Sequence, residues 1–406
     1  MTGAISNQTT STIGANANLA VTSNTLQNSG KINAKKTGTI VTGALTNTGE
    51  IVTDEKLVIN ASSLNNSGKV YANGVTTTVT DALTNTSTAT LTAANTLTIK
   101  ANAINNAGSL AADQTVDLEA ASLIQSGSLV SKGKLTARKL SSVENTGTLT
   151  ANQLNLQTDR LVNLGTGLIA ASGDAAVTAT TLNNLGRIHV DGETTLTTHR
   201  LNNAGKLEAI GGLTASQVLS VQNSGSLTGG DVVLNTQTLD NTGRIEVQSL
   251  NATAYTSTQA TEVKNSGVIA ADRVTLKGFD QVSNSNQIST DVTWASARAD
   301  SGKVEISTGT FDNTNGRVLA RGNLDITATN VRNAKSTLSS KGDMRITATQ
   351  DIDNQEGLIL HQGSGSALVQ ATRTLSNTKG QIEGQGQSLT VKGGDIDNTE
   401  GQILQA

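Results

Sequence analysis

Apolar and polar residues alternate in short runs along almost the whole chain. Runs such as Leu97-Thr-Ile99, Val116-Asp-Leu118 and Leu154-Asn-Leu156 direct every second side chain to the same side. That period of two is typical of β-strands with one buried face. Gly, Asn and Asp separate the runs, as tight turns require. The pattern therefore predicts many short strands, and no stretch keeps the i, i+3, i+4 spacing of a helix.

A repeat marked by Asn, any residue and Gly organises these strands. The motif returns at steps of mostly 18 to 21 residues, and past residue 310 its turn lengthens, as from Asn354 to Gly357. A fixed period of this size indicates a solenoid. The motif begins at Asn28, Asn47, Asn66, Asn106, Asn145, Asn163, Asn184, Asn203, Asn223, Asn241 and Asn265.

Three short strands and three turns in about 20 residues correspond to one coil of a right-handed parallel β-helix. Roughly 20 such coils, stacked about 4.8 Å apart, would form a rod about 95 Å long. The absence of Pro agrees, because Pro would remove a hydrogen-bond donor from strands paired on both sides. We expect the repeated Asn side chains to stack as an amide ladder and the following Gly to supply the positive φ of a corner. Hexapeptide, leucine-rich and calcium-binding nonapeptide repeats do not fit the spacing.

Three stretches of one continuous rod can be distinguished. Residues 1–243 hold regular repeats, residues 244–312 are irregular with a possible loop insertion, and residues 313–406 have the longer Asn-x-x-Gly turn. Neither end shows the atypical cap that closes a solenoid, so we expect a segment of a longer protein.

Four of the five aromatic residues fall in or at the edge of the irregular stretch. Phe279 and Phe311 occupy inward positions and are expected in the core. Tyr255 and Trp294 lie in the least repeat-like parts, and they are the candidate binding residues, since exposed aromatics often anchor recognition. A structural junction without any binding role explains the same irregularity.

Composition sets several function classes aside. Charged residues make up 15% with a net charge of −3, so no basic surface for nucleic acid is expected. No apolar run approaches the ~20 residues that span a bilayer, and residues 1–20 lack the features of a signal peptide. The absence of Cys excludes disulfides, thiol nucleophiles and Cys-based metal sites.

No constellation for catalysis, metal or cofactor binding is apparent. His189, His199 and His361 are expected on the surface, without the carboxylate partners of a catalytic or metal site. Asp351-Ile-Asp353 and Asp395-Ile-Asp397 precede Asn turns and are expected to be solvated corner residues. Polysaccharide-active β-helix enzymes need carboxylates on adjacent coils inside a walled cleft, so an enzyme remains only a remote alternative.

The phrase Leu239-Asp-Asn-Thr-Gly-Arg-Ile245 resembles the repeat of filamentous haemagglutinin-like exoproteins, and variants begin at Leu201, Phe311 and Leu375. The resemblance covers nearly the whole chain. Proteins of this family include bacterial adhesins and the toxin-delivery proteins of contact-dependent growth inhibition. Both kinds are exported by two-partner secretion through an outer-membrane transporter. The resemblance therefore implies a secreted protein on the outer face of a Gram-negative cell.

From this resemblance we expect a rigid extracellular filament or stalk segment that projects a distal adhesive or toxin module toward other cells. In the alternative, the segment itself is an adhesin module that binds a receptor on host or target bacteria. The expected partners are the secretion transporter during export and, in the alternative, that receptor. Nucleic acid is not an expected partner, no cofactor is expected, and the chain is expected to be monomeric.

Overall fold

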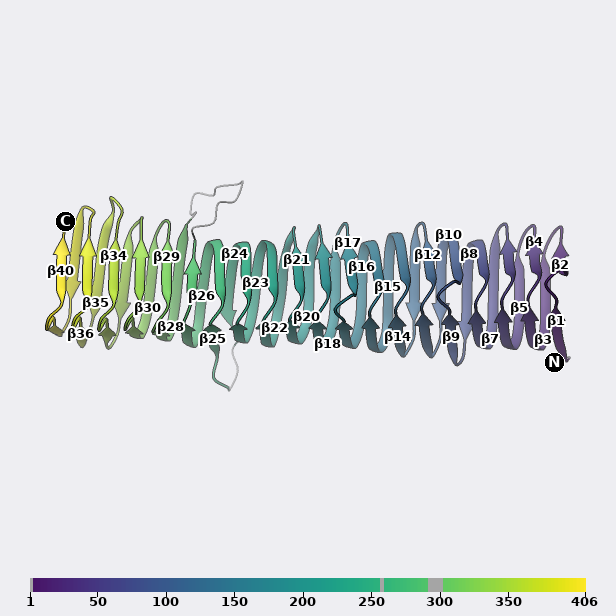
Figure 1. Cartoon of the computed structure of the whole chain (residues 1–406), viewed down its shortest axis with the longest axis horizontal. Helices are drawn as coiled ribbons and strands as arrows, with labels where there is room; N and C mark the ends of the chain where they lie inside the picture. Colours follow the sequence, from purple (N-terminus) through teal and green to yellow (C-terminus); the bar gives the residue numbers. More distant parts are fainter. Residues whose placement is uncertain (1–2, 256–258, 291–301) are drawn as a thin grey trace. The chain divides into compact units, whose positions relative to one another are not determined.

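The computed structural model describes residues 3–255, 259–290 and 302–406, and within them every regular element is a β-strand. The strands stack in parallel as a β-solenoid of about 19 turns with about 20 residues per turn (Figure 1). The all-β parallel β-helix predicted from the repeat is therefore confirmed.

The chain divides into two compact units, residues 1–195 and residues 196–406. The strands of the first unit are β1 (Ala4–Asn7), β2 (Thr12–Ala15), β3 (Leu19–Asn28), β4 (Lys31–Ala34), β5 (Gly38–Asn47), β6 (Glu50–Thr53), β7 (Lys56–Asn66), β8 (Lys69–Val79), β9 (Ala82–Asn85), β10 (Thr90–Lys100), β11 (Ala103–Asn106), β12 (Ser109–Ala112), β13 (Thr115–Glu119), β14 (Ser122–Gln125), β15 (Ser128–Asn145), β16 (Thr148–Asn163), β17 (Leu168–Ala171), β18 (Ala175–Asn184) and β19 (Arg187–Val190).

Strand β20 (Glu193–Asn203) begins just before the division between the units. The strands of the second unit are β21 (Lys206–Ala209), β22 (Gly212–Asn223), β23 (Ser226–Asn241), β24 (Arg244–Ala254), β25 (Glu262–Asn265), β26 (Val268–Asn284), β27 (Gln287–Ser289), β28 (Lys303–Asp312), β29 (Arg317–Ala320), β30 (Leu324–Arg332), β31 (Thr337–Ser340), β32 (Met344–Ala348), β33 (Ile352–Asp353), β34 (Leu358–His361), β35 (Ser366–Ala371), β36 (Thr374–Ser376), β37 (Gln381–Gly384), β38 (Ser388–Lys392), β39 (Asp395–Asp397) and β40 (Gln402–Gln405).

Equivalent apolar residues stack in buried columns inside each unit. In the first unit Leu45 pairs in register with Leu64, and Leu64 pairs with Leu83. Leu118 is fully buried between Ile99 and Ala137, as the period-two pattern predicted. Burying one such aliphatic side chain stabilises the fold by about 1.5–3 kcal/mol, so the repeated columns supply the core.

The predicted amide ladder is present in both units. Asn28 donates from Nδ2 to Asn47 Oδ1 at 2.7 Å and to the carbonyl of Glu50 at 3.0 Å. The side chains in the column are buried, so these bonds satisfy polar groups that would be costly in the core. The ladder bonds of the first unit run over Asn7, Asn28, Asn47, Asn66, Asn85, Asn106 and Gln125, and again over Asn145, Asn163 and Asn184.

The expected role of the corner glycine was wrong. The glycines with positive φ among the described residues are Gly212, Gly229, Gly278 and Gly302, none of which closes an Asn-x-Gly corner. A Cβ on Gly68 would overlap the carbonyl oxygen of Gly49 in the preceding coil. Glycine is therefore required at this position because the stacked backbones approach closely. A left-handed backbone conformation is not the reason.

The longer turns of the second unit do contain a left-handed residue. It precedes the Gly or Ser that ends each turn, and its φ lies between 53° and 61°. The residues at this position are Asn315, Lys335, Glu356, Lys379 and Glu400.

The ladder runs through residues 244–312 despite their irregular spacing. Asn265 donates to Asn284 and Asn284 donates to Asn313, both at 2.7 Å. The additional residues fall between β24 and β25 and between β27 and β28. Phe279 and Phe311 are buried, as predicted.

Candidate functional site

The two aromatic residues proposed from the sequence differ in what the structure says of them. Tyr255 follows the last residue of β24, is half-buried, and donates its backbone N–H to the carbonyl of Thr236 at 2.9 Å. Trp294 lies outside the described residues. A shared binding role for Tyr255 and Trp294 therefore stays a prediction.

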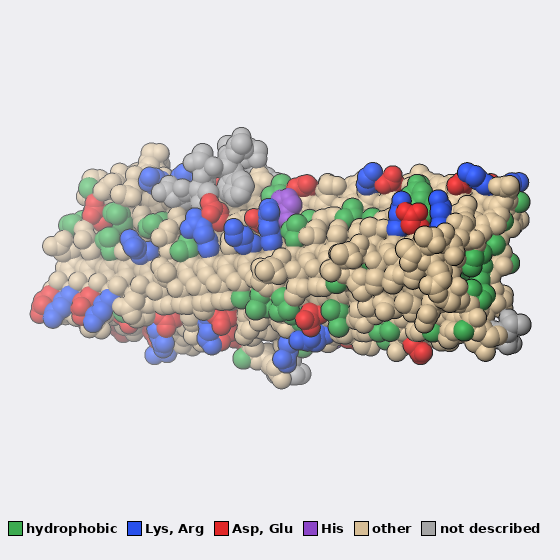
Figure 2. All heavy atoms as spheres, turned by 45° about the vertical axis from the view of Figure 1, so that its right-hand side comes forward, with side chains coloured by type: hydrophobic (Ala, Val, Ile, Leu, Met, Phe, Trp, Pro, Cys, Tyr) green, Lys and Arg blue, Asp and Glu red, His purple; other side chains and the backbone are tan. Residues whose placement is uncertain are grey.

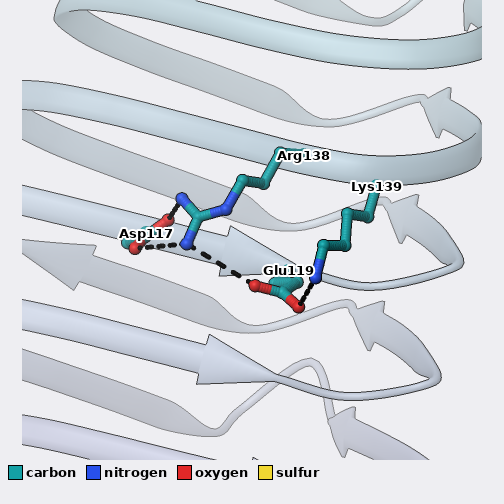
Figure 3. Close-up of polar contacts among 4 residues, drawn as sticks. All are labelled: Asp117, Glu119, Arg138 and Lys139. Atoms are coloured by element: carbon teal, nitrogen blue, oxygen red, sulfur yellow. Dashed lines mark hydrogen bonds and ion pairs between the residues drawn. The ribbon is translucent and has the colours of Figure 1, made fainter.

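A group of four connected charges in the first unit joins β13 to β15 (Figure 3). Arg138 forms two parallel bonds to the Asp117 carboxylate, Nη1 to Oδ1 at 2.5 Å and Nη2 to Oδ2 at 3.2 Å. Its Nη2 also lies 3.5 Å from Glu119 Oε2, while Lys139 Nζ lies 2.5 Å from Glu119 Oε1. The fork of a guanidinium matches a carboxylate in this bidentate geometry.

The hydrogen bond from Lys139 lowers the pKa of Glu119. Burial opposes this effect, and the charges of Lys139, Lys100 and Arg138 add to the lowering. Glu119 is thus held as a carboxylate that accepts a hydrogen bond from Lys139 and forms an ion pair with Arg138. Such a group ties one coil to the next, and it is a poor proton donor for catalysis.

A second mixed-charge group lies in the other unit, around Glu305 of β28. Lys277 Nζ lies 2.7 Å from Glu305 Oε1 and Lys303 Nζ lies 3.2 Å from Oε2. Partial burial acts to raise the pKa of Glu305, but hydrogen bonds from Lys277 and Lys303 outweigh it and the pKa is lowered. This group also connects neighbouring strands.

The histidines are placed differently from one another. His199 is exposed, and His189 Nε2 lies 3.0 Å from Asp191 Oδ1 on the surface. The prediction of a surface position was wrong for His361, which is fully buried with no hydrogen-bond partner for either ring nitrogen in the described part of the chain. Its neighbours in the column are Ser340, which has a small side chain, and Gly384, which has none, so there is room for the ring.

Beside His189 the first unit has a shallow surface hollow of about 460 Å³. Val130, Thr150 and Ala170 are among the residues that line it, together with His189 and Asp191. The hollow is open and its exposed surface is mostly apolar, whereas a small-substrate site is normally an enclosed cleft. Among the described residues no three His, Asp or Glu side chains are arranged to hold a metal ion.

The described part of the chain contains no helix that could cross a membrane. The model of the haemagglutinin repeat family matches residues 281–364 and 362–406. The longer turns of the second unit fall within these residues. The chain carries a filamentous haemagglutinin-like repeat region.

A curated relative extends the similarity beyond those residues. Toxin CdiA of Escherichia coli is 26% identical over 302 residues, which cover 69% of this chain. The chain spans only 9% of the length of that protein. No solved structure matches the chain.

Sequence reasoning missed the cross-coil ion pairs. Asp117 and Arg138 are 21 residues apart, about one coil, and that spacing of opposite charges was the available signal. It also missed the left-handed column of Lys335, Glu356, Lys379 and Glu400, although each of these residues directly precedes the end of a longer turn.

Proposed function

We propose that this chain is a filament segment of a secreted bacterial surface exoprotein, and that it acts as a spacer that projects a distal adhesive or toxin module. The observation that carries the proposal is the repetition of one coil, strand upon strand, in a chain that carries haemagglutinin repeats. Neighbouring coils are bonded to each other along their strands, which favours a mechanical role. The likeness to Toxin CdiA of Escherichia coli supports a parent protein of the toxin-delivery kind.

A spacer needs no catalytic group, and the geometry agrees with that. The carboxylates of Asp117, Glu119 and Glu305 are each paired with a lysine or arginine on a neighbouring strand. We infer that the segment is not an enzyme. Export by two-partner secretion through an outer-membrane transporter and display on the cell surface are parts of the same proposal.

Exchange of coils within the parent protein tests the spacer role. Residues 67–106 comprise two coils, because the ladder passes from Asn66 through Asn85 to Asn106. Replacing them with a copy of residues 146–184, the two coils that end at Asn163 and Asn184, keeps the coil number and changes the surface. We expect unchanged secretion and unchanged activity of the distal module. Loss of that activity with normal secretion would contradict a spacer.

The alternative is that the segment itself binds a receptor through Tyr255 and Trp294. It is favoured by the position of Tyr255, half-buried directly after β24. Purified chain that binds target cells, and loses binding in the Tyr255→Ala/Trp294→Ala variant with unchanged circular dichroism, would support this alternative. Absence of cell binding leaves the spacer role.

A further inference from the structure

The left-handed residues of the last four longer turns form one column of alternating charge. Lys335, Glu356, Lys379 and Glu400 occupy the same place in the turns that join β30 to β31, β33 to β34, β36 to β37 and β39 to β40. Backbone bonds stack these turns, from Lys335 N to Gln355 O at 3.0 Å and from Lys379 N to Thr399 O at 2.9 Å. Neighbouring charges are therefore about one strand spacing apart, roughly 4.8 Å.

These four side chains point into solvent. Their exposed fractions are 63% for Lys335, 44% for Glu356, 54% for Lys379 and 69% for Glu400. Figure 2 shows acidic and basic side chains alternating along one edge at the C-terminal end of the molecule. The contacts inside the column are long, 4.0 Å for Lys335 to Glu356 and 3.7 Å for Lys379 to Glu400. Each ammonium and carboxylate therefore keeps hydrogen-bonding capacity for another partner.

The turns beside the column carry small residues. Each left-handed residue is followed by Ser336, Gly357, Gly380 or Gly401, so the position after each charge has a small side chain or none. A shallow polar furrow of about 480 Å³ runs along the same turns. Its lining includes Thr337, Gln381 and Gln402, whose side chains are uncharged. A partner with a straight surface and regularly spaced charges therefore fits along these turns.

The order of positive and negative side chains along the column determines which partner is complementary to it. Read along the column the charges are plus, minus, plus, minus, and a two-fold axis between Glu356 and Lys379 turns this order into its opposite. In an antiparallel pair, Lys335 would face Glu400 of the second copy and Glu356 would face Lys379 of the second copy. A parallel pair in register would bring like charges together. Isologous contacts of this kind are the usual way in which identical chains associate.

We propose that the column Lys335–Glu356–Lys379–Glu400 is an interaction surface for a second copy of this chain in antiparallel orientation. The proposal goes beyond a spacer role, because it joins two filaments side by side, and it departs from the monomer expected from the sequence. Ion pairs between exposed side chains are individually weak and are screened by salt. The association is therefore weak, and we expect it to weaken roughly tenfold between low and half-molar salt.

Reversing the charges of the column in the full chain tests whether this surface joins two copies. The acidic variant Lys335→Glu/Lys379→Glu and the basic variant Glu356→Lys/Glu400→Lys each carry one sign along the column. We expect the wild type to form dimers in sedimentation experiments at low salt, each variant alone to be monomeric, and an equimolar mixture of the two variants to form dimers again. Recovery in the mixture also shows that both variants are folded. A monomeric wild type, or a mixture that stays monomeric, would overturn the proposal.

A matched control separates this column from charge in general. Asp113→Lys breaks the exposed pair of Asp113 with Lys132 in the first unit, where the two atoms are 2.8 Å apart. We expect this variant to form dimers as the wild type does. Loss of dimers in the control would overturn the assignment to this surface.

The absence of Cys from the chain allows the orientation to be measured. Gln355 and Thr378 directly precede the two central charges, so in an antiparallel pair each faces the other across the axis. A mixture of Gln355→Cys and Thr378→Cys chains should form the mixed disulfide under oxidation, in excess of either homodimer. A predominance of disulfides between identical positions would indicate a parallel pair and would overturn the antiparallel proposal.

Discussion

Gln125 departs from asparagine in the amide ladder of the first unit. It accepts a bond from Asn106 Nδ2 at 2.9 Å, but its own Nε2 donates to the carbonyl of Thr148 at 3.2 Å. Asn145 Oδ1 is consequently buried without a donor in the described structure. Leaving a buried acceptor unsatisfied costs about 1–3 kcal/mol. The ladder is therefore weakest where the longer amide replaces the shorter one.

Restoring asparagine at this position should stabilise the chain. In Gln125→Asn the shorter side chain can donate to Asn145 Oδ1, as Asn66 does to Asn85 at 2.8 Å. We expect a gain of about 1 kcal/mol in the free energy of unfolding, measured by chemical denaturation. The matched reverse change, Asn66→Gln, should lose a similar amount. Equal stability of both variants and the wild type would show that the unpaired acceptor carries no cost.

At the scale of the turn, the spacing between stacked backbones determines which glycines are essential. Gly68→Ala would drive a Cβ into the Gly49 carbonyl oxygen, and neither backbone can move without disturbing the ladder. A Cβ added at Gly74, six residues later, would meet no atom within 4 Å, and Gly74 has no positive φ. We expect Gly68→Ala to cost about 1–3 kcal/mol. Gly74→Ala should be neutral or gain up to about 1 kcal/mol, because alanine restricts the unfolded chain. Thermal unfolding of the two variants measures the difference, and similar melting temperatures would contradict it.

At the scale of paired strands, Glu305 makes the stability of the second unit depend on pH. Its pKa is lowered in the folded chain, since the bonds from Lys277 and Lys303 outweigh the opposing effect of burial. A lowered folded pKa means that the stabilisation is complete above the unfolded value of about 4.3 and is lost as the pH falls through the folded value. Glu305→Gln should therefore be less stable than the wild type at neutral pH, and the gap should close below about pH 4. Denaturation at several pH values checks this, and a gap independent of pH would count against the ion pairs.

The strands and their inward residues could be predicted because they depend on local alternation and on the repeat. Leu118, Phe279 and Phe311 are buried where the period of two placed them. Contacts between coils could not be predicted in the same way, because coil length varies and pairs such as Asp117 with Arg138 depend on exact register. His361 is buried in a column whose neighbouring positions, Ser340 and Gly384, are small, and this pairing could not be read from its own coil. Lys and Glu at left-handed turn positions run against local preference, so only the stacked structure identifies them.

At the scale of the whole chain, stability is a sum over neighbouring coils. Each coil bonds to the one before and the one after, as the pairing of β5 with β3 and with β7 illustrates. In such a solenoid, local damage raises the free energy of the nearest coils and leaves distant ones almost unchanged. Opening can therefore be local, at a free energy well below that of complete unfolding.

A buried charge at Leu118 tests this local behaviour. Leu118→Asp would place a carboxylate between Ile99 and Ala137 with no cation inside the core, at a cost of about 3–5 kcal/mol. Leu118→Met conserves volume and polarity and should cost less than about 1.5 kcal/mol. We expect amide hydrogen exchange in the Asp variant to accelerate in the coils around residue 118 and to stay at wild-type rates across residues 303–406. Uniform acceleration along the whole chain would mean that the coils unfold together, and unchanged exchange around residue 118 would mean that its side chain does not face the core.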